Sequence, residues 1–163
     1  MIQLKMAILP IVTGAENPIL RKKTKRVKRV TKEVLTFIED LQDTVIARKG
    51  AGIAAPQVGS NQRICLALIG KRMVTLIDPL ITWMSDETVT GDEGCLSLPG
   101  IWLRVERAKS IVLSYIDEKG KPQERKLSGW DARVVQHEVD HLDGILIVDR
   151  SSEHVTVTEE VES

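Results

Sequence analysis

The sequence predicts an α+β fold in which antiparallel or mixed β-sheets pack around a central buried helix with an H-E-x-x-H pattern, and an amphipathic helix lies near the N-terminus. Three observations support this fold class. Residues 31–48 carry apolar side chains at helical spacing, two hairpin patterns follow, and residues 129–142 return to a helical pattern. Helical and strand patterns therefore alternate along a chain that has no internal repeat.

The N-terminal helix is expected over residues 31–48, with Gly50 just beyond it as a C-terminal cap. Its apolar residues recur every three or four positions and share one face. They are Val34, Ile38, Leu41 and Val45. This helix should cover part of a hydrophobic core.

Two hairpins of antiparallel strands are expected in the middle of the chain. The first joins residues 63–69 to residues 73–77 across Gly-Lys-Arg, and the second joins residues 110–117 to residues 122–127 across Glu-Lys-Gly-Lys. Residues 101–108 are a weaker strand candidate. The strands should supply the sheets against which the helices pack.

Length and composition bound the domain organisation. The chain has 163 residues, of which 42% are hydrophobic, so it can bury one compact core and is short for two. We expect a single domain over residues 1–150 and an acidic tail with four glutamates over residues 151–163.

The charge balance excludes some classes of function. The 23 basic and 23 acidic residues cancel, which argues against a protein that binds DNA or a membrane surface through bulk electrostatics. Residues 21–29 carry seven basic side chains, but a solvated loop explains this run better than a contact with nucleic acid does.

Cys65 and Cys95 form no C-x-x-C pair, as expected in a reducing compartment. No apolar run reaches the roughly 20 residues that span a bilayer, and we expect a cytoplasmic protein.

The helix expected over residues 129–142 should be largely buried. Ser128 and Asp131 have the spacing of a capping box, and Gly144 follows the helix as a C-terminal cap. Its apolar sector is broad, so most of its surface should face other parts of the protein. The members of this sector are Trp130, Val134, Val135, Val139 and Leu142.

Two of the three histidines lie in this helix, in the segment QHEVDHLDG. At about 100° per residue, His137 and His141 fall about 20° to either side of Trp130, so both imidazoles share the inward face. Histidines at i and i+4, with Glu138 after the first, match the H-E-x-x-H pattern. In that pattern the histidines bind a metal ion and the glutamate lies beside it.

A third metal ligand is required, and the sequence offers several candidates. The metzincin pattern would place a histidine at residue 147, which is Ile147. A thermolysin-like site would use a later glutamate, and Glu159, Glu160 and Glu162 are available in a segment with weak helical propensity. Cys65 lies in an apolar run and is interpreted as a core residue. Cys95 lies between a glycine and a polar turn, where packing gives no reason for it, and it would complete a Cys-His-His site with an open fourth position.

Three segments together resemble the peptide deformylase family. They are GAGIAAPQ at residues 50–57, EGCLS at residues 93–97 and QHEVDHLDG at residues 136–144. They occur in the family's order, and the resemblance extends over about residues 8–150. It implies a metal-dependent hydrolase that removes the formyl group from N-formylmethionine at the start of new polypeptides and releases formate.

The resemblance implies roles for individual residues. Cys95, His137 and His141 would hold one divalent metal, and Glu138 would act as the general base and acid. The side-chain amide of Gln57 would stabilise the developing oxyanion.

The backbone N–H of Leu96 would be the second donor to that oxyanion. Asp140, on another side of the helix, would support the site without binding the metal. The family generally uses Fe²⁺ in cells, and Zn²⁺, Ni²⁺ or Co²⁺ suit the same ligands.

The resemblance also implies a substrate site. Gly50 and Gly52 would let an extended peptide pair with the main chain beside them. Gly94, Trp130 and Val134 complete the candidate substrate-binding residues, and the last two would line an apolar pocket for methionine.

The chain departs from the family at two positions near this site. Ala51 stands where a larger aliphatic residue is frequent, and Trp102 stands where many members have a polar or basic residue. The shape of the methionine pocket is therefore left open, and so is the contact with the peptide beyond it.

The expected partners are N-formylmethionyl peptides and nascent chains, without DNA or membrane, and the protein is expected to be a monomer. A transient contact between residues 21–29 and ribosomal RNA is a further hypothesis. Two alternative functions remain open: a zinc peptidase of the H-E-x-x-H type, and a non-catalytic protein that binds formylated or nascent chains.

Overall fold

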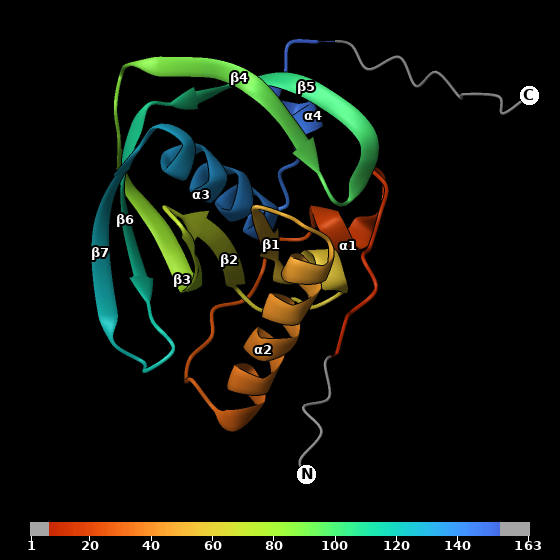
Figure 1. Cartoon of the computed structure of the whole chain (residues 1–163), viewed down its shortest axis with the longest axis vertical. Helices are drawn as coiled ribbons and strands as arrows, with labels where there is room; N and C mark the ends of the chain where they lie inside the picture. Colours follow the sequence, from red (N-terminus) through yellow and green to blue (C-terminus); the bar gives the residue numbers. More distant parts are fainter. Residues whose placement is uncertain (1–6, 154–163) are drawn as a thin grey trace, which may run out of the picture.

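The computed structural model describes residues 7–153 and has an α+β architecture with antiparallel sheets (Figure 1), which confirms the predicted fold class at this level. One sheet has five strands in the order β1-β2-β3-β6-β7, and the other consists of β4 and β5. All pairs between these strands are antiparallel, so the alternative of mixed sheets does not apply to them.

Two helices precede the strands, a short 3₁₀ helix lies between β1 and β2, and two helices follow the last strand. The strands are β1 (Gly52–Ala54), β2 (Ile64–Ile69), β3 (Arg72–Met84), β4 (Thr88–Cys95), β5 (Leu98–Ala108), β6 (Ser110–Ile116) and β7 (Pro122–Ser128). The helices are α1 (Pro18–Arg21), α2 (Lys32–Ala47), the short 3₁₀ helix η1 (Ala55–Val58), α3 (Gly129–Leu142) and α4 (Ile147–Arg150). None of the helices in the described part of the chain has the length and apolar character needed to span a membrane.

Strand β2 explains how the two long helices are placed. Cys65 and Ala67 belong to a cluster of buried residues with α3, whereas Ile64 and Leu66 belong to a cluster with α2. Since successive side chains of a strand point to opposite faces, α2 and α3 pack on opposite faces of this sheet. The continuous apolar run in β2 is therefore the consequence of burial on both sides.

Helix α3 lies between the five-stranded sheet and the β4–β5 ribbon, which curves over it in Figure 1. Val135 and Leu142 are fully buried in the cluster that α3 forms with the five-stranded sheet. The side of α3 that faces β4 instead carries polar residues, including Arg133, His137 and His141. The helix thus separates an apolar core from a polar, enclosed region.

Several local expectations were wrong. Strand β3 continues to Met84, beyond the expected end at residue 77, because a bulge at Asp78 (φ 49°) lets the strand bend and continue. Strand β4 was not predicted, and Cys95 is its last residue, directly before the turn at residues 96–97. Ser128 makes no capping hydrogen bond, and Asp131 accepts one from the backbone of Gly70 instead.

Part of the predicted acidic tail, residues 154–163, lies outside the described residues, as do the alternative ligands Glu159, Glu160 and Glu162.

Candidate metal centre and substrate pocket

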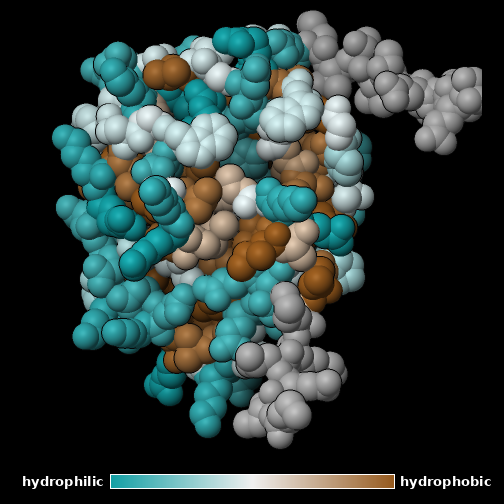
Figure 2. Space-filling model, viewed as in Figure 1, coloured by the Kyte–Doolittle hydropathy of each residue, from teal (hydrophilic) through white to brown (hydrophobic). Residues whose placement is uncertain are grey.

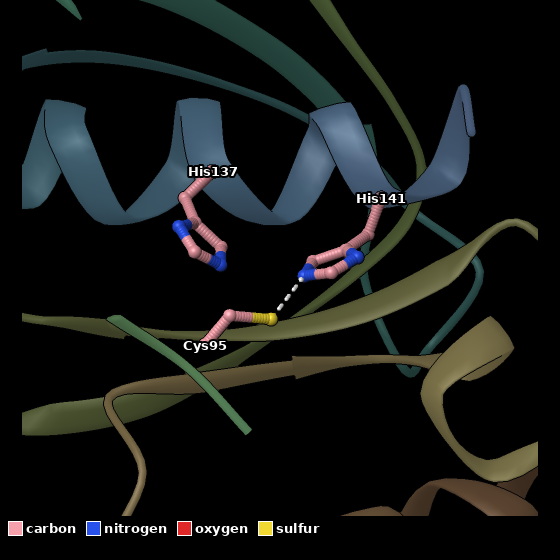
Figure 3. Close-up of side chains that lie close together, drawn as sticks. All are labelled: Cys95, His137 and His141. Carbon is pink, nitrogen blue, oxygen red and sulfur yellow. Dashed lines mark hydrogen bonds between the residues drawn. The ribbon is translucent and has the colours of Figure 1, made fainter. Parts of the chain in front are cut away.

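Cys95, His137 and His141 converge on one point between β4 and α3. Their ligand atoms all lie within 4.8 Å of one another, and Cys95 Sγ is 3.3 Å from His141 Nε2. Figure 3 shows both imidazoles on the same side of α3, pointing toward the thiol below them. Residues 42 to 46 positions apart in the sequence are therefore brought together by the packing of one strand against one helix.

Glu93 fixes the orientation of the first imidazole. Its Oε1 lies 2.8 Å from His137 Nδ1, which leaves Nε2 of the same ring free to face Cys95. A carboxylate that accepts from the distal nitrogen sets the tautomer of a histidine and increases its basicity as a ligand. Sequence reasoning missed this residue, although its position two residues before Cys95 puts both side chains on the same face of β4.

A chain of ion pairs around the buried Arg107 holds Glu93 in place. Arg107 donates to Oε2 and Oε1 of Glu93, each at 2.9 Å, and to Asp140 Oδ2 at 2.5 Å. Arg150 donates to the other oxygen of Asp140 at 2.9 Å. Although burial alone would raise it, the hydrogen bonds from His137 and Arg107 lower the pKa of Glu93 to about 2. Glu93 is therefore ionised at neutral pH, and Asp140 supports the site through Arg107 without reaching the metal ligands.

Glu138 is buried beside the cluster and is not one of its members. Burial raises the pKa of Glu138 to about 7, and within residues 7–153 its Oε2 has no hydrogen-bond partner. Burial also lowers the pKa of His141, which keeps that imidazole neutral and able to bind a metal. By contrast, burial raises the pKa of Cys65, whose thiol lies in the core away from the cluster.

Gly52 is required by the close approach of β1 to Glu138. A Cβ atom at this position would lie 2.7 Å from the carbonyl oxygen of Leu66 and 2.8 Å from both Cγ and Oε1 of Glu138. Both distances are shorter than van der Waals contact. The glycine therefore lets the strand and the carboxylate lie side by side.

Gln57 points its side-chain amide at the cluster. Its Oε1 accepts from the backbone N–H of Ala54 at 2.9 Å, and its Nε2 donates to Ser97 Oγ at 3.1 Å and lies 3.8 Å from Cys95 Sγ. These contacts fix which end of the amide is the donor. The N–H groups of Gln57 consequently face the space beside the thiol.

A pocket of about 390 Å³ opens over the cluster. Most of the site residues expected from the sequence line this pocket. They are Gln57, Leu96, Glu138, Gly50, Gly52, Gly94, Trp130, Val134, Cys95 and His137. His141 is not among the lining residues and is only 1% exposed, so it is the deepest member of the cluster. Figure 2 shows apolar residues gathered in the middle of this face and hydrophilic residues around them.

Two tryptophans that line the pocket are exposed to solvent and not buried in its wall. Trp130 is 58% exposed in the first turn of α3 and lies at the mouth of the pocket. Trp102 is 71% exposed, and its ring lies 3.0 Å from the position that a Cβ of Gly94 would take. Gly94 thus provides the surface on which the Trp102 ring rests. Val134, by contrast, is buried.

Comparisons with known proteins agree with this geometry. The polypeptide deformylase family model matches residues 8–156. The chain belongs to the polypeptide deformylase family. The peptide deformylase of Pseudothermotoga lettingae is 44% identical over 133 residues, which cover 82% of this chain and 77% of the relative.

Solved deformylase structures have the same fold. The crystal structure of the Thermotoga maritima peptide deformylase has a TM-score of 0.86 at 40% identity and covers 90% of this chain and 99% of that one. A Synechococcus elongatus deformylase in complex with actinonin has a TM-score of 0.86 at 37% identity and covers 94% and 85%. A Met-Ala-Ser complex of the Acinetobacter baumannii enzyme has a TM-score of 0.86 at 32% identity and covers 90% and 99%.

The chain is therefore an enzyme, a metal-dependent hydrolase that removes the N-formyl group from newly made polypeptides. The expectation from the three sequence motifs is confirmed at the level of family and activity.

Proposed function

We propose that deformylation takes place in the pocket above Cys95, His137 and His141, with one divalent metal held by these three residues. The observation that carries the proposal is the convergence of one thiol and two imidazole nitrogens within 4.8 Å. Three protein ligands with a fourth position open to the pocket are typical of catalytic metal sites, whereas structural sites are closed by four. The neutral His141 and the Glu93-bound His137 suit this role.

The chemistry begins with water, whose attack on the formyl carbon needs activation. When bound, a divalent metal lowers the pKa of water from about 15.7 to about 7. Glu138 takes the proton of the attacking water and delivers it to the nitrogen of the departing amine as the carbon–nitrogen bond breaks. Its Oε2, which is buried next to the cluster and has no hydrogen-bond partner among the described residues, supports this role.

The formyl oxygen gains negative charge during the attack, and two donors would receive it. The Nε2 group of Gln57 is held beside the thiol by Ser97 and Ala54, and Leu96 follows the metal-binding cysteine directly. Donors that are already oriented stabilise such charge without reorganisation, and losing one typically costs about 2.7 to 4 kcal/mol. Gln57 and the backbone N–H of Leu96 are our candidates.

The substrate peptide would bind along β1. This strand lies at one end of the five-stranded sheet, so one of its edges has no strand partner among the described residues. An extended peptide could add to this edge through main-chain hydrogen bonds, next to Gly50 and Gly52. The methionine side chain would occupy the pocket beside Val134, with Trp130 and Trp102 at its mouth. The Met-Ala-Ser complex of the Acinetobacter baumannii enzyme supports a peptide that begins with methionine.

The identity of the metal, the location and the partners are finer parts of the proposal. We favour Fe²⁺, with Zn²⁺, Ni²⁺ or Co²⁺ as replacements, because a thiolate with two imidazoles suits all four. A monomer in the cytoplasm is proposed, since nascent chains emerge there. The single domain over residues 1–150 remains part of this proposal.

A ribosome contact would use a groove lined by Arg26, Lys28, Arg29 and Lys119. Two acidic residues also line it, but Asp78 accepts from the backbone of Val27 and Glu118 accepts from Thr75. The four basic side chains of the groove outnumber its two acidic ones and suit RNA phosphates. Ribosome binding that is unchanged after neutralising the basic residues of 21–29 would remove this contact.

The test of the proposed function is formate release from formyl-Met-Ala by metal-loaded protein. The deformylase releases formate and Met-Ala in equal amounts. A peptidase of the H-E-x-x-H type would release free amino acids instead, and a non-catalytic binding protein would release nothing. Metal analysis of anaerobically purified protein identifies the ion in the same preparation.

A further inference from the structure

The proposed metal centre is part of a longer series of paired residues, in which successive inward-facing positions of strand β4 lie opposite successive turns of helix α3. On β4, Gly91, Glu93 and Cys95 are two residues apart, and on α3 the matching residues Arg133, His137 and His141 are four apart. Two strand residues rise about 6.8 Å and four helix residues rise about 6.0 Å, so three successive pairs stay in step. The second and third pairs are Glu93 with His137 and Cys95 with His141. The first pair, Gly91 with Arg133, has no role in the mechanism described above.

Arg133 is a buried cation with well-placed acceptors. Its Nη1 donates to Glu93 Oε2 at 2.6 Å and to the carbonyl oxygen of Val105 at 2.9 Å, and its Nη2 donates to the carbonyl oxygen of Val89 at 2.6 Å. The residue is 7% exposed. A buried guanidinium needs such partners, because an unpaired buried charge is strongly destabilising.

Gly91 provides the space for this guanidinium. A Cβ atom on Gly91 would lie 3.2 Å from Arg133 Cζ and 3.3 Å from its Nη2. Any side chain at this position would press on the guanidinium, whereas the glycine lets it lie flat against the strand. Gly91 and Arg133 are therefore a matched pair.

The two arginines around Glu93 approach it from different elements. Arg107, from β5, contacts both carboxylate oxygens, and Arg133, from α3, contacts Oε2 only. His137 shares Oε1 with Arg107. Arg107 holds both carboxylate oxygens in a two-point contact from β5. Arg133 adds a further contact to the same carboxylate from α3, the helix that also carries His137 and His141.

We propose that Arg133, seated on Gly91, is a positioning residue that fixes Glu93 and thereby the His137 ring toward the metal. The inference rests on the proposed function, because it concerns the same metal centre. Arg133 also lines the substrate pocket, so a role as a simple wall is the competing interpretation. A wall would change KM for the substrate, whereas a positioning residue changes how tightly the metal is held.

The experiment compares Arg133→Met and Arg133→Lys with the control Arg104→Met, since Arg104 is an exposed arginine on the neighbouring strand β5. Each protein is loaded with Co²⁺, and three quantities are measured. They are the visible spectrum of the Co²⁺ form, the rate of Co²⁺ transfer to a chelator, and kcat and KM for formyl-Met-Ala.

For Arg133→Met we expect Co²⁺ loss about 10-fold faster, at the low end of the effects of residues that orient ligands. The spectrum should shift, and kcat should fall about 10-fold with KM within about twofold. Arg133→Lys should lie between Arg133→Met and the unmodified protein. Methylguanidinium in the buffer should slow Co²⁺ loss from Arg133→Met and leave Arg104→Met unchanged.

The inference is overturned if Arg133→Met holds Co²⁺ as the unmodified protein does, whether its stability falls or its KM rises. If Arg133→Met fails to fold, the same Co²⁺ measurements on Gly91→Ala and Arg133→Lys test the inference. Gly91→Ala must displace the guanidinium by a few tenths of an ångström and should accelerate Co²⁺ loss in the same direction, and an unchanged rate in both variants refutes the idea. Formate release by the unmodified protein decides the proposed function separately.

Discussion

The two sides of α3 differ in the kind of interaction that attaches them to the rest of the protein. Toward the five-stranded sheet, the helix packs fully buried apolar residues such as Val135 and Leu142 against strand residues such as Leu113. Toward β4, it presents His137, His141 and charged residues that find specific partners one by one. The apolar side stabilises the fold without directional contacts. The polar side depends on the register of one strand, so its substitutions should affect metal and turnover more than folding.

The largest effect is expected for the thiol on the polar side. Cys95→Ala removes one of the three proposed metal ligands, and two imidazoles do not hold a divalent ion well, so the purified protein should lose its metal and its deformylase activity. Metal content per chain, measured after dialysis, checks this prediction. Cys65→Ala is the matched control, since that thiol is buried in the apolar core and its loss should leave metal content unchanged.

Glu138→Gln should separate catalysis from metal binding. The variant keeps the shape of the side chain and all three proposed ligands, so the metal should stay, while kcat should fall about 10²- to 10⁴-fold through loss of proton transfer. Stopped assays of formate release and metal analysis on one sample make the measurement. Glu124→Gln, on the exposed edge of β7, should change neither quantity. Loss of metal from Glu138→Gln would count against its assignment as a general base.

These two sides also differ in how far the sequence predicted them. The helical spacing of His137 and His141 and of the apolar residues Val135 and Leu142 was sufficient to predict a buried helix of nearly the observed length, because a 3.6-residue period is a local property. The apolar strands β2 and β6 were predicted for the same kind of reason. Local sequence patterns were therefore sufficient to predict most elements of the apolar side.

The polar side could be predicted only in part. Strand β4 contains two glycines and several exposed polar residues, so its sequence lacks the alternation that marks a strand, and its pairing with β5 determines its conformation. Glu93 contacts His137, which is 44 residues away in the sequence, and Arg133 contacts Gly91, which is 42 residues away. No local period encodes such pairs. Cys95 was identified because a cysteine between a glycine and a polar segment had no explanation from packing.

Leu113→Ala should act on the apolar side alone. Leu113 is fully buried on β6 in the cluster with α3, and truncation of a buried leucine typically costs about 2 to 5 kcal/mol of unfolding free energy. Urea unfolding at equilibrium measures the loss. The kcat of the folded fraction should stay within about twofold of the unmodified value, and a larger decrease would show that the two sides of α3 are coupled.

Gly52→Ala probes the point where the two sides meet. The added methyl group would press on the carbonyl oxygen of Leu66, which belongs to the sheet, and on Glu138, which belongs to the polar side. The side chain of Glu138 can move away from this contact and the backbone carbonyl cannot, so the protein should lose about 1 to 3 kcal/mol of stability through overpacking. Displacement of Glu138 should also reduce kcat, by less than Glu138→Gln does.

Gly50→Ala is the matched comparison for this last variant. Its Cβ would meet side-chain atoms of Leu96 and Val45 at 3.2 Å and the carbonyl oxygen of Gly52 at 3.3 Å, all farther away than the 2.7 Å between a Cβ on Gly52 and the carbonyl oxygen of Leu66. Its loss of stability should therefore be smaller than that of Gly52→Ala, as measured by urea unfolding of both proteins. Equal losses would mean that β1 itself can move, in which case the glycine at position 52 serves the approach of a substrate more than the placement of Glu138.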